Sequence, residues 1–404
     1  MAEKKRPDYT PRMIVLRAGW VVPVEGLPLR DACVAVSDGH VEWVGPARGS
    51  PAGEARDLGP GVLLPGLVNA HCHLELSHLA GRLAGARGFV DWVERLVALR
   101  GADPIERVLS RAAAAIAEVE ETGTVAVGDV SNTLAHLDLL ARSSLRARVF
   151  LELIGWDPAR AARVMADAQA RLAARAPAGS IQVSLAAHAP HSVSPALFAA
   201  LRAAGGPSSL HLAESPGERR FLDGGDEAWS AFLARRGLGH VRFQPPGMSP
   251  VRYLDALGVL VPGLVAAHGV QVDAGDAALL AARGVAVVLC PRSNRALDVG
   301  EPPVPALRAA GVRLCVGTDS LASVDSLDLW DDVLALRQAF PALEPAWLVH
   351  AATRGGADAL GFGELGRIAR GAAAAFAFAE GPREIADPLA FLVSGEARPR
   401  GVRP

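Results

Sequence analysis

Two histidines separated by one residue follow an apolar run near the start of the chain. Residues 64–70 are mostly apolar and lead directly into His71-Cys72-His73. Side chains alternate faces along a β-strand, so His71 and His73 would point to one side and Cys72 to the other. Two imidazoles on one face supply half of a metal site, although a pair of surface histidines on an edge strand would have the same spacing.

Further histidines and acids stand where later apolar runs stop. They are His188 with His191, His211 with Glu214, His268, and Asp319. Any one of them alone could simply cap a strand by hydrogen bonding. Zn²⁺ in catalytic sites takes imidazole nitrogens and carboxylate oxygens, and it lowers the pKa of a bound water to about 7. The set therefore predicts a catalytic metal site formed by His71, His73, His211 and Asp319.

The position of Glu214 suggests a role beside the metal rather than on it. It lies three residues after His211, a spacing that lets it face the substrate as a proton carrier. An acid in the first turn of a helix, where the helix dipole stabilises negative charge, would occupy the same position. Lysine occurs only at positions 4 and 5, which excludes a carboxylated lysine bridging two metals and Schiff-base chemistry by an internal lysine.

Short apolar runs that alternate with helical segments would position these side chains. The predicted strands are 67–72, 124–130, 146–153, 181–187, 208–212, 263–268, 285–290 and 312–318. Strands that alternate with helices are typical of parallel βα units. Eight units predict an α/β fold, a (β/α)8 TIM-like barrel over residues 66–365. Its active site would lie at the carboxyl ends of the strands, where the histidines and acids stand.

The two ends of the chain carry β-type segments instead. Residues 1–12 are predicted to be a flexible tail, and residues 13–65 contain short apolar strands with a Ser37-Asp38-Gly39-His40 hairpin turn. This segment is too short to fold well alone, so we expect it to form a small β-sandwich domain with residues 366–404. The predicted strands of that C-terminal part are 372–378 and 389–393.

The composition excludes several classes of partner. The chain has 41 basic and 43 acidic residues and a net charge of −2, so no basic surface for nucleic acid is expected. The apolar runs are too short to span a membrane, and the polar N-terminus does not resemble a secretory signal. Four widely spaced cysteines do not form a disulfide framework. These features predict a cytoplasmic enzyme that acts on a small molecule, without a membrane partner.

Taken together, the motifs resemble the amidohydrolase superfamily, in its mononuclear deaminase and chlorohydrolase branch. The resemblance is carried by residues 65–73, 211–215, 268, 290–294 and 317–319. It implies one divalent metal, usually zinc and sometimes iron, on the four ligands named above, and it allows a homodimer. It also implies catalytic roles: Glu214 carries a proton from water to a ring nitrogen, and His268 and Asp319 steer the attacking water.

A finer resemblance concerns the substrate. The run from His71 to Ser77, together with residues 88–93, 248–254 and 318–323, looks like the aminodeoxyfutalosine deaminases of menaquinone biosynthesis. This resemblance implies hydrolytic deamination of a 6-aminopurine nucleoside-like substrate, aminodeoxyfutalosine, to futalosine. We expect substrate contacts from Glu75, Ser77, His188, His191 and Arg292.

Three alternatives remain open at this point. One is a deaminase of S-adenosylhomocysteine, methylthioadenosine, adenosine or guanine, because loops after the strands shape the pocket. Another is hydrolytic displacement of chloride or amine from a triazine-type ring. The third is a non-catalytic binding protein on the same fold, which would be expected to have lost metal ligands that this chain retains.

Overall fold

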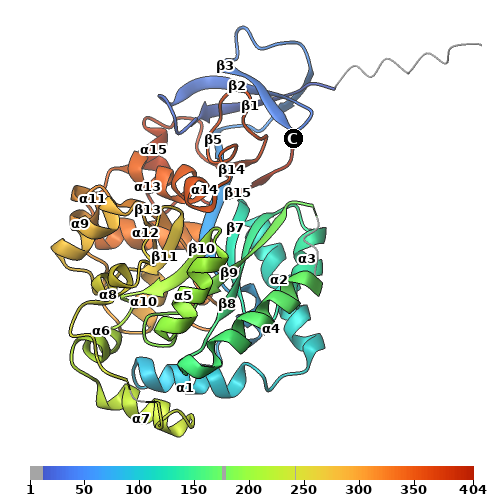
Figure 1. Ribbon diagram of the computed structural model, residues 1–404. Helices are drawn as coiled ribbons and strands as arrows, with labels where there is room; N and C mark the ends of the chain where they lie inside the picture. Colours follow the sequence, from blue (N-terminus) through green and yellow to red (C-terminus); the bar gives the residue numbers. More distant parts are fainter. Residues whose placement is uncertain (1–11, 175–178, 242) are drawn as a thin grey trace, which may run out of the picture.

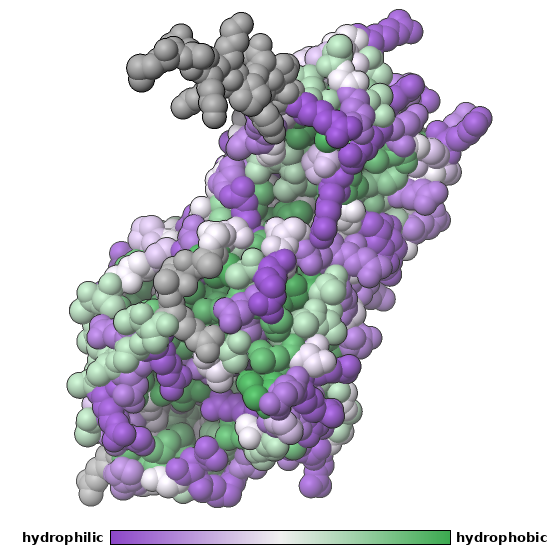
Figure 2. Space-filling view, turned by 90° about the vertical axis from the view of Figure 1, so that its right-hand side faces the viewer, coloured by the Kyte–Doolittle hydropathy of each residue, from purple (hydrophilic) through white to green (hydrophobic). Residues whose placement is uncertain are grey.

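The computed structural model describes residues 12–174, 179–241 and 243–404 (Figure 1). Residues 1–11 of the predicted tail lie outside this part of the chain. The fold is mixed α/β. A sheet built from both ends of the chain lies at the top of the view in Figure 1, and the remaining strands, surrounded by helices, lie below it. Among the described residues, no helix is long and apolar enough to cross a bilayer. Hydrophilic residues are interspersed over the face shown in Figure 2.

The upper sheet has seven strands in the order β15-β14-β5-β1-β2-β3, with β4 paired to β1. Its strands are β1 (Ile14–Val21), β2 (Leu29–Ser37), β3 (His40–Pro46), β4 (Glu54–Asp57), β5 (Gly61–Pro65), β14 (Phe376–Glu380) and β15 (Pro399–Val402). Strand β14 pairs antiparallel with β5, so the two ends of the chain meet as expected. The ladders describe one sheet, and the second layer of a sandwich stays a prediction, as do the domain boundaries.

Two local expectations at the chain ends had different outcomes. The hairpin turn between β2 and β3 is present, with Asp38 and Gly39 both in the left-handed region, as a tight hairpin requires. The prediction of a strand at 389–393 is wrong, because residues Pro388–Leu392 form helix α15. Asp387 accepts hydrogen bonds from the backbone N–H groups of Leu389 and Ala390, and a proline follows it at the first helical position. This combination begins a helix.

All eight central strands occur where the sequence predicts them. Strands β6 (Leu67–Cys72), β7 (Thr124–Ser131), β8 (Arg146–Leu153) and β9 (Ile181–Ala187) form one parallel sheet. Strands β10 (Ser208–Leu212), β11 (Leu264–His268), β12 (Ala286–Leu289) and β13 (Arg313–Val316) form a second.

Backbone hydrogen bonds connect the two sheets at both junctions. The N–H of His211 donates to the carbonyl of His188 (2.8 Å), next to β9 and β10. The N–H groups of Thr318 and Asp319 donate to the carbonyl of His71 (3.1 and 3.0 Å), next to β13 and β6. The ladders themselves remain two four-stranded sheets, so a continuous eight-stranded barrel is not established by strand pairing.

Helices follow most of the central strands. They are η1 (Leu74–Leu79), α1 (Phe89–Leu99), α2 (Ile105–Glu121), α3 (Leu137–Arg142), η2 (Pro158–Arg160), α4 (Ala161–Ala174), α5 (Pro195–Ala204), α6 (Pro216–Asp223), α7 (Glu227–Arg235), α8 (Pro250–Ala256), α9 (Ala274–Ala282), α10 (Pro291–Ala296), α11 (Val304–Ala309), α12 (Leu329–Ala339), α13 (Pro345–Ala352) and α14 (Arg354–Leu360). A serine side chain caps α5, α6 and α8, each before a proline. Helices α1 and α7 lie at the end of the molecule opposite the upper sheet (Figure 1).

Candidate metal centre and active site

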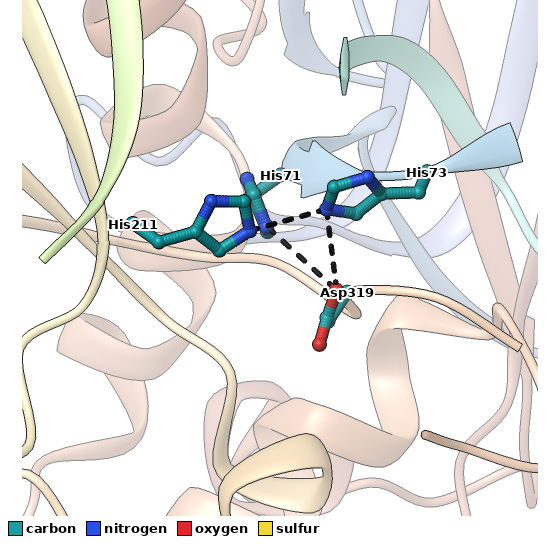
Figure 3. A group of neighbouring side chains, drawn as sticks. All are labelled: His71, His73, His211 and Asp319. Carbon is teal, nitrogen blue, oxygen red and sulfur yellow. Dashed lines mark hydrogen bonds and ion pairs between the residues drawn. The ribbon is translucent and has the colours of Figure 1, made fainter. Parts of the chain in front are cut away.

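Four buried side chains converge at the carboxyl ends of β6, β10 and β13 (Figure 3). His73 Nε2 lies 3.5 Å from Asp319 Oδ1 and 3.3 Å from His211 Nε2, and His71 Nε2 lies 3.8 Å from the same carboxylate oxygen. The four candidate ligand atoms all lie within 4.8 Å of one another. The structure thus brings together the residues that the sequence predicted as one metal site.

The electrostatic state of these histidines fits a divalent cation. Burial, followed by repulsion from neighbouring imidazoles, lowers the pKa of His71 well below its ordinary value. Burial is also the main reason that the pKa values of His73 and His211 fall to about 3. The rings are therefore neutral near pH 7, the form that binds metals. Among the described residues, neither ring nitrogen of His71 has a hydrogen-bond partner. Three neutral imidazoles and one carboxylate match a catalytic zinc site.

The carboxylate of Asp319 is oriented by two serines. Ser293 Oγ and Ser323 Oγ donate to its Oδ2, at 2.5 and 3.1 Å. The other oxygen, Oδ1, is the one that faces the nitrogens of His71 and His73. One oxygen is thus held by the protein while the other remains available to a cation.

The backbone after His73 is held by a second buried acid. Asp129, at the end of β7, accepts a hydrogen bond from the N–H of Leu74 (2.8 Å) and one from Nε2 of His136 (2.7 Å). All three residues are buried. These bonds restrict the turn that carries His73 out of β6. Asp129 therefore helps to position His73, one of the candidate ligands, through the backbone.

Glu214 lines the same cavity as His73, His211 and Asp319. Its Oε1 lies 3.7 Å from His268 Nε2, and the side chain is buried. Burial, reinforced by the charges of Asp319 and Glu152, raises the pKa of Glu214 well above its ordinary value. Glu218 accepts hydrogen bonds from the N–H groups of Ala213 and Glu214, at 3.1 and 2.8 Å. The backbone of Glu214 is therefore held by Glu218, and burial favours the protonated form of its carboxyl group.

A cavity of about 340 Å³ is lined at one end, here called its inner end, by His73, His211, Glu214 and Asp319. Its outer end is lined by aromatic side chains from α1 and α7 and from the segment after β8: Phe89, Trp92, Trp156, Trp229 and Phe232. The rings of Phe89 and Trp229 lie 6.1 Å apart across the two helices. A polar reactive end that opens into an aromatic chamber is typical of a small-molecule site.

The predicted substrate contacts are only partly assembled at this cavity. His188 and His191 line it; Nδ1 of His188 lies 2.6 Å from the hydroxyl of Ser192, and the ring of His191 packs against Trp229 at 4.4 Å. The buried hydroxyl of Ser77 is not among the lining groups.

Glu75 and Arg292 also lie outside the cavity lining, because other protein groups occupy their polar atoms. The carboxylate of Glu75 accepts hydrogen bonds from the hydroxyls of Ser131 (2.6 Å) and Thr133 (2.9 Å), and so holds the loop after β7. The guanidinium of Arg292 pairs with Asp332 at 3.0 Å and donates to the carbonyl of Ser326 at 2.7 Å.

Sequence reasoning missed Glu152, a buried acid that lines the cavity. Its Oε1 lies 3.6 Å from His211 Nδ1, and Asn132 donates to its Oε2 at 2.9 Å. Glu152 stands at the end of a correctly predicted strand, so the rule that identified the histidines would have found it. The aromatic wall gave no comparable signal, because its residues belong to helices and connecting segments.

Comparisons with known proteins agree with this geometry. The model of the "Amidohydrolase family" matches residues 62–399. An aminodeoxyfutalosine deaminase of Deinococcus radiodurans is 36% identical over 320 residues, which cover 76% of this chain and 75% of that protein. A 5-methylthioadenosine/S-adenosylhomocysteine deaminase of Nitratidesulfovibrio vulgaris is 30% identical over 375 residues, covering 85% of this chain and 77% of that protein.

Solved structures show the same architecture. An adenosine deaminase of Xanthomonas campestris with bound zinc has a TM-score of 0.80 and 29% identity, covering 94% of this chain and 88% of that chain. An aminofutalosine deaminase of Helicobacter pylori in complex with methylthio-coformycin has a TM-score of 0.84 at 23% identity, covering 96% of this chain and 97% of that chain. The second likeness shows the fold alone.

Proposed function

The chain belongs to the amidohydrolase family and is a hydrolytic deaminase; on that premise we propose that it deaminates a 6-aminopurine nucleoside, aminodeoxyfutalosine, to give futalosine. The observation that carries the proposal is Glu214, a buried carboxyl group with a raised pKa that faces His268 beside the His–His–His–Asp cluster. A protonated acid next to a hydrolytic centre suits a ring whose nitrogen must gain a proton as the adjacent carbon is attacked.

Each residue then has a defined task. A divalent cation held by the predicted ligands, with zinc as the proposed ion, would supply Lewis acidity and lower the pKa of a water molecule. His268 and Asp319 accept the proton that the attacking water loses. Glu214 protonates the ring nitrogen next to the reacting carbon, then takes the proton of the new hydroxyl group on that carbon and passes it to the departing amine. The proton held by His268 and Asp319 returns to Glu214 and restores the starting state. Water and the aminopurine are consumed, and the 6-oxopurine and ammonia are formed.

The choice of substrate is supported by the outer cavity and by the relatives. The aromatic wall offers rings on which a purine can stack. Three arginines, Arg100, Arg160 and Arg236, also line the cavity, and their positive charge favours a substrate that carries negative charge away from its reacting ring. The 36% identity to the aminodeoxyfutalosine deaminase exceeds the 30% identity to the methylthioadenosine/S-adenosylhomocysteine deaminase.

Two architectural details and a cellular setting complete the proposal. We infer that the two four-stranded sheets act as one (β/α)8 barrel, supported by the hydrogen bonds at both junctions. The proposed sandwich at the chain ends would form the smaller domain. The enzyme would act on its small-molecule substrate in the cytoplasm, in menaquinone biosynthesis.

Ammonia release from a substrate panel tests this function. Metal-loaded protein would be incubated with aminodeoxyfutalosine, methylthioadenosine, S-adenosylhomocysteine, adenosine, guanine and a chlorotriazine. We expect the highest kcat/KM for aminodeoxyfutalosine. Preference for another aminopurine would reassign the substrate within the deaminases, and chloride release without ammonia would contradict the deaminase function.

A further inference from the structure

Helix α10 places Asn294 directly against the ring of His268. Asn294 Oδ1 lies 2.9 Å from His268 Nδ1, and both side chains are fully buried. We propose that Asn294 is a positioning residue that keeps the proton of His268 on Nδ1, so that the lone pair of Nε2 faces the reacting centre. This inference rests on the proposed function, because it assigns the state in which His268 takes up a proton from water.

The hydrogen bond decides the tautomer by elimination. A side-chain carbonyl oxygen can only accept, so Nδ1 must carry a proton to bond with Asn294 Oδ1. A neutral imidazole carries a single proton on its two nitrogens. Nε2 is therefore left with its lone pair free, the form that accepts a proton in general base catalysis.

The surroundings of Nε2 favour the same tautomer. Among the described residues it has no hydrogen-bond partner, and Oε1 of the Glu214 carboxyl group lies 3.7 Å away. If Glu214 is protonated on this oxygen, its O–H can donate to a lone pair on Nε2 of His268, whereas it would repel an N–H at that nitrogen. The ring of His268 also lies 5.7 Å from that of His71 and 5.4 Å from that of His211. A cation on those ligands would repel an N–H dipole pointing at it.

The short helix that carries Asn294 is itself fixed. Ser293, the preceding residue, donates to Asp319 at 2.5 Å, and Arg292 pairs with Asp332 at 3.0 Å. Successive residues of α10 thus orient two groups of the proposed mechanism, Asp319 and His268. Among the described residues, the buried Nδ2 of Asn294 has no partner. An apolar side chain of similar size would therefore relieve one unsatisfied donor while it removes the acceptor.

Two substitutions and one control separate positioning from folding. Asn294→Leu removes the acceptor at similar volume, whereas Asn294→Asp keeps an oxygen at the same place. Thr124→Val is the control. Thr124 is also buried, and its hydroxyl has no partner among the described residues, but it is the first residue of β7 and so lies at the end of the strand opposite to the site. Long-range ¹H–¹⁵N spectra of zinc-loaded protein with ¹⁵N-labelled histidine would report the tautomer. kcat, KM and metal content would be measured in parallel.

We expect the wild-type spectrum to show His268 protonated on Nδ1. In Asn294→Leu this signature should be lost and kcat should fall about 10–100-fold, with KM changed by less than about 3-fold. Asn294→Asp should keep the proton on Nδ1 and recover kcat to within about 10-fold of wild type. The control should match wild type in both readouts.

A wild-type spectrum with the proton on Nε2 would overturn the proposal, whichever substrate is turned over. So would an Asn294→Leu variant that keeps both the tautomer and kcat. If no aminopurine releases ammonia, the proposed function fails, yet the spectra still decide the role of Asn294. The two failures are therefore distinguishable.

Discussion

The inner and outer ends of the cavity are built on different principles. At the inner end the candidate ligands and Glu214 are buried, and Asp319 and the backbone of Glu214 are held by hydrogen bonds from neighbouring groups. At the outer end, helix α1 has no fully buried residue, and on helix α7 only Trp229 is buried. Under the proposed function, the reaction would depend on a fixed inner end, and substrate choice on a wall whose two helices, α1 and α7, are more exposed.

Backbone conformation strengthens this contrast. Ala213, His268 and Asp319, at or just after the ends of β10, β11 and β13, have φ values of 50°, 76° and 62°. This left-handed region is unfavourable for residues with a side chain and persists only where the surroundings enforce it. Here the N–H of Asp319 donates a hydrogen bond to the carbonyl of His71, and the N–H of Ala213 donates one to the carboxylate of Glu218. The strained positions coincide with the proposed chemistry.

The largest effect is expected from removing one of the four candidate metal ligands. Asp319→Ala removes the one carboxylate of the set, so we expect the bound metal to be lost and kcat/KM to fall by about 10⁴-fold or more. Metal analysis and ammonia release would be measured on the same sample. Chelation of the wild type should reproduce the loss, and added zinc should restore only the wild type. Full turnover by metal-free protein would contradict a metal-dependent inner end.

The next largest effect concerns the proton carrier. Glu214→Gln keeps the shape of the side chain but removes its acidic proton, so kcat should fall about 10²–10⁴-fold while metal content is unchanged. Because burial raises the pKa of Glu214, the protonated, active form persists to higher pH. In the wild type, kcat should therefore decrease as the pH rises through that raised pKa. A variant that retained nearly full activity would remove Glu214 from the mechanism.

The same contrast explains what the sequence could predict. Strand positions, the ligands and Glu214 follow from apolar runs and from residues at their ends, where local spacing determines geometry. Glu75 and Arg292 were expected to contact substrate, but their partners, Ser131 and Asp332, belong to segments far away in the chain. The aromatic wall depends on how α1 packs against α7, which no local pattern encodes.

A smaller, different effect is expected at the outer wall. Trp92 lines the cavity and is partly exposed, so Trp92→Ala should raise KM about 10-fold through lost stacking and apolar contact while kcat changes less than about 3-fold. Steady-state kinetics with the preferred aminopurine would measure this. Trp43→Ala, a tryptophan of the upper sheet, is the control and should leave both constants unchanged. A fall in kcat without a change in KM would place Trp92 with the inner end.

The smallest effect is expected from charge at the outer wall, and two adjacent arginines allow a matched test. Arg235 hydrogen-bonds to Glu94 of α1 at 2.8 Å, whereas Arg236 lines the cavity and has no carboxylate partner among the described residues. Arg236→Gln should raise KM about 2–5-fold for an aminopurine that carries a carboxylate, and not for adenosine, since exposed charges interact weakly through water. The effect should shrink as salt is added, because ions screen such interactions over about 10 Å at 0.1 M.

The control variant, Arg235→Gln, should not discriminate between the two substrates, because the charge of Arg235 is already paired with Glu94. Equal changes for both substrates with Arg236→Gln would mean that the outer wall selects by shape rather than by charge.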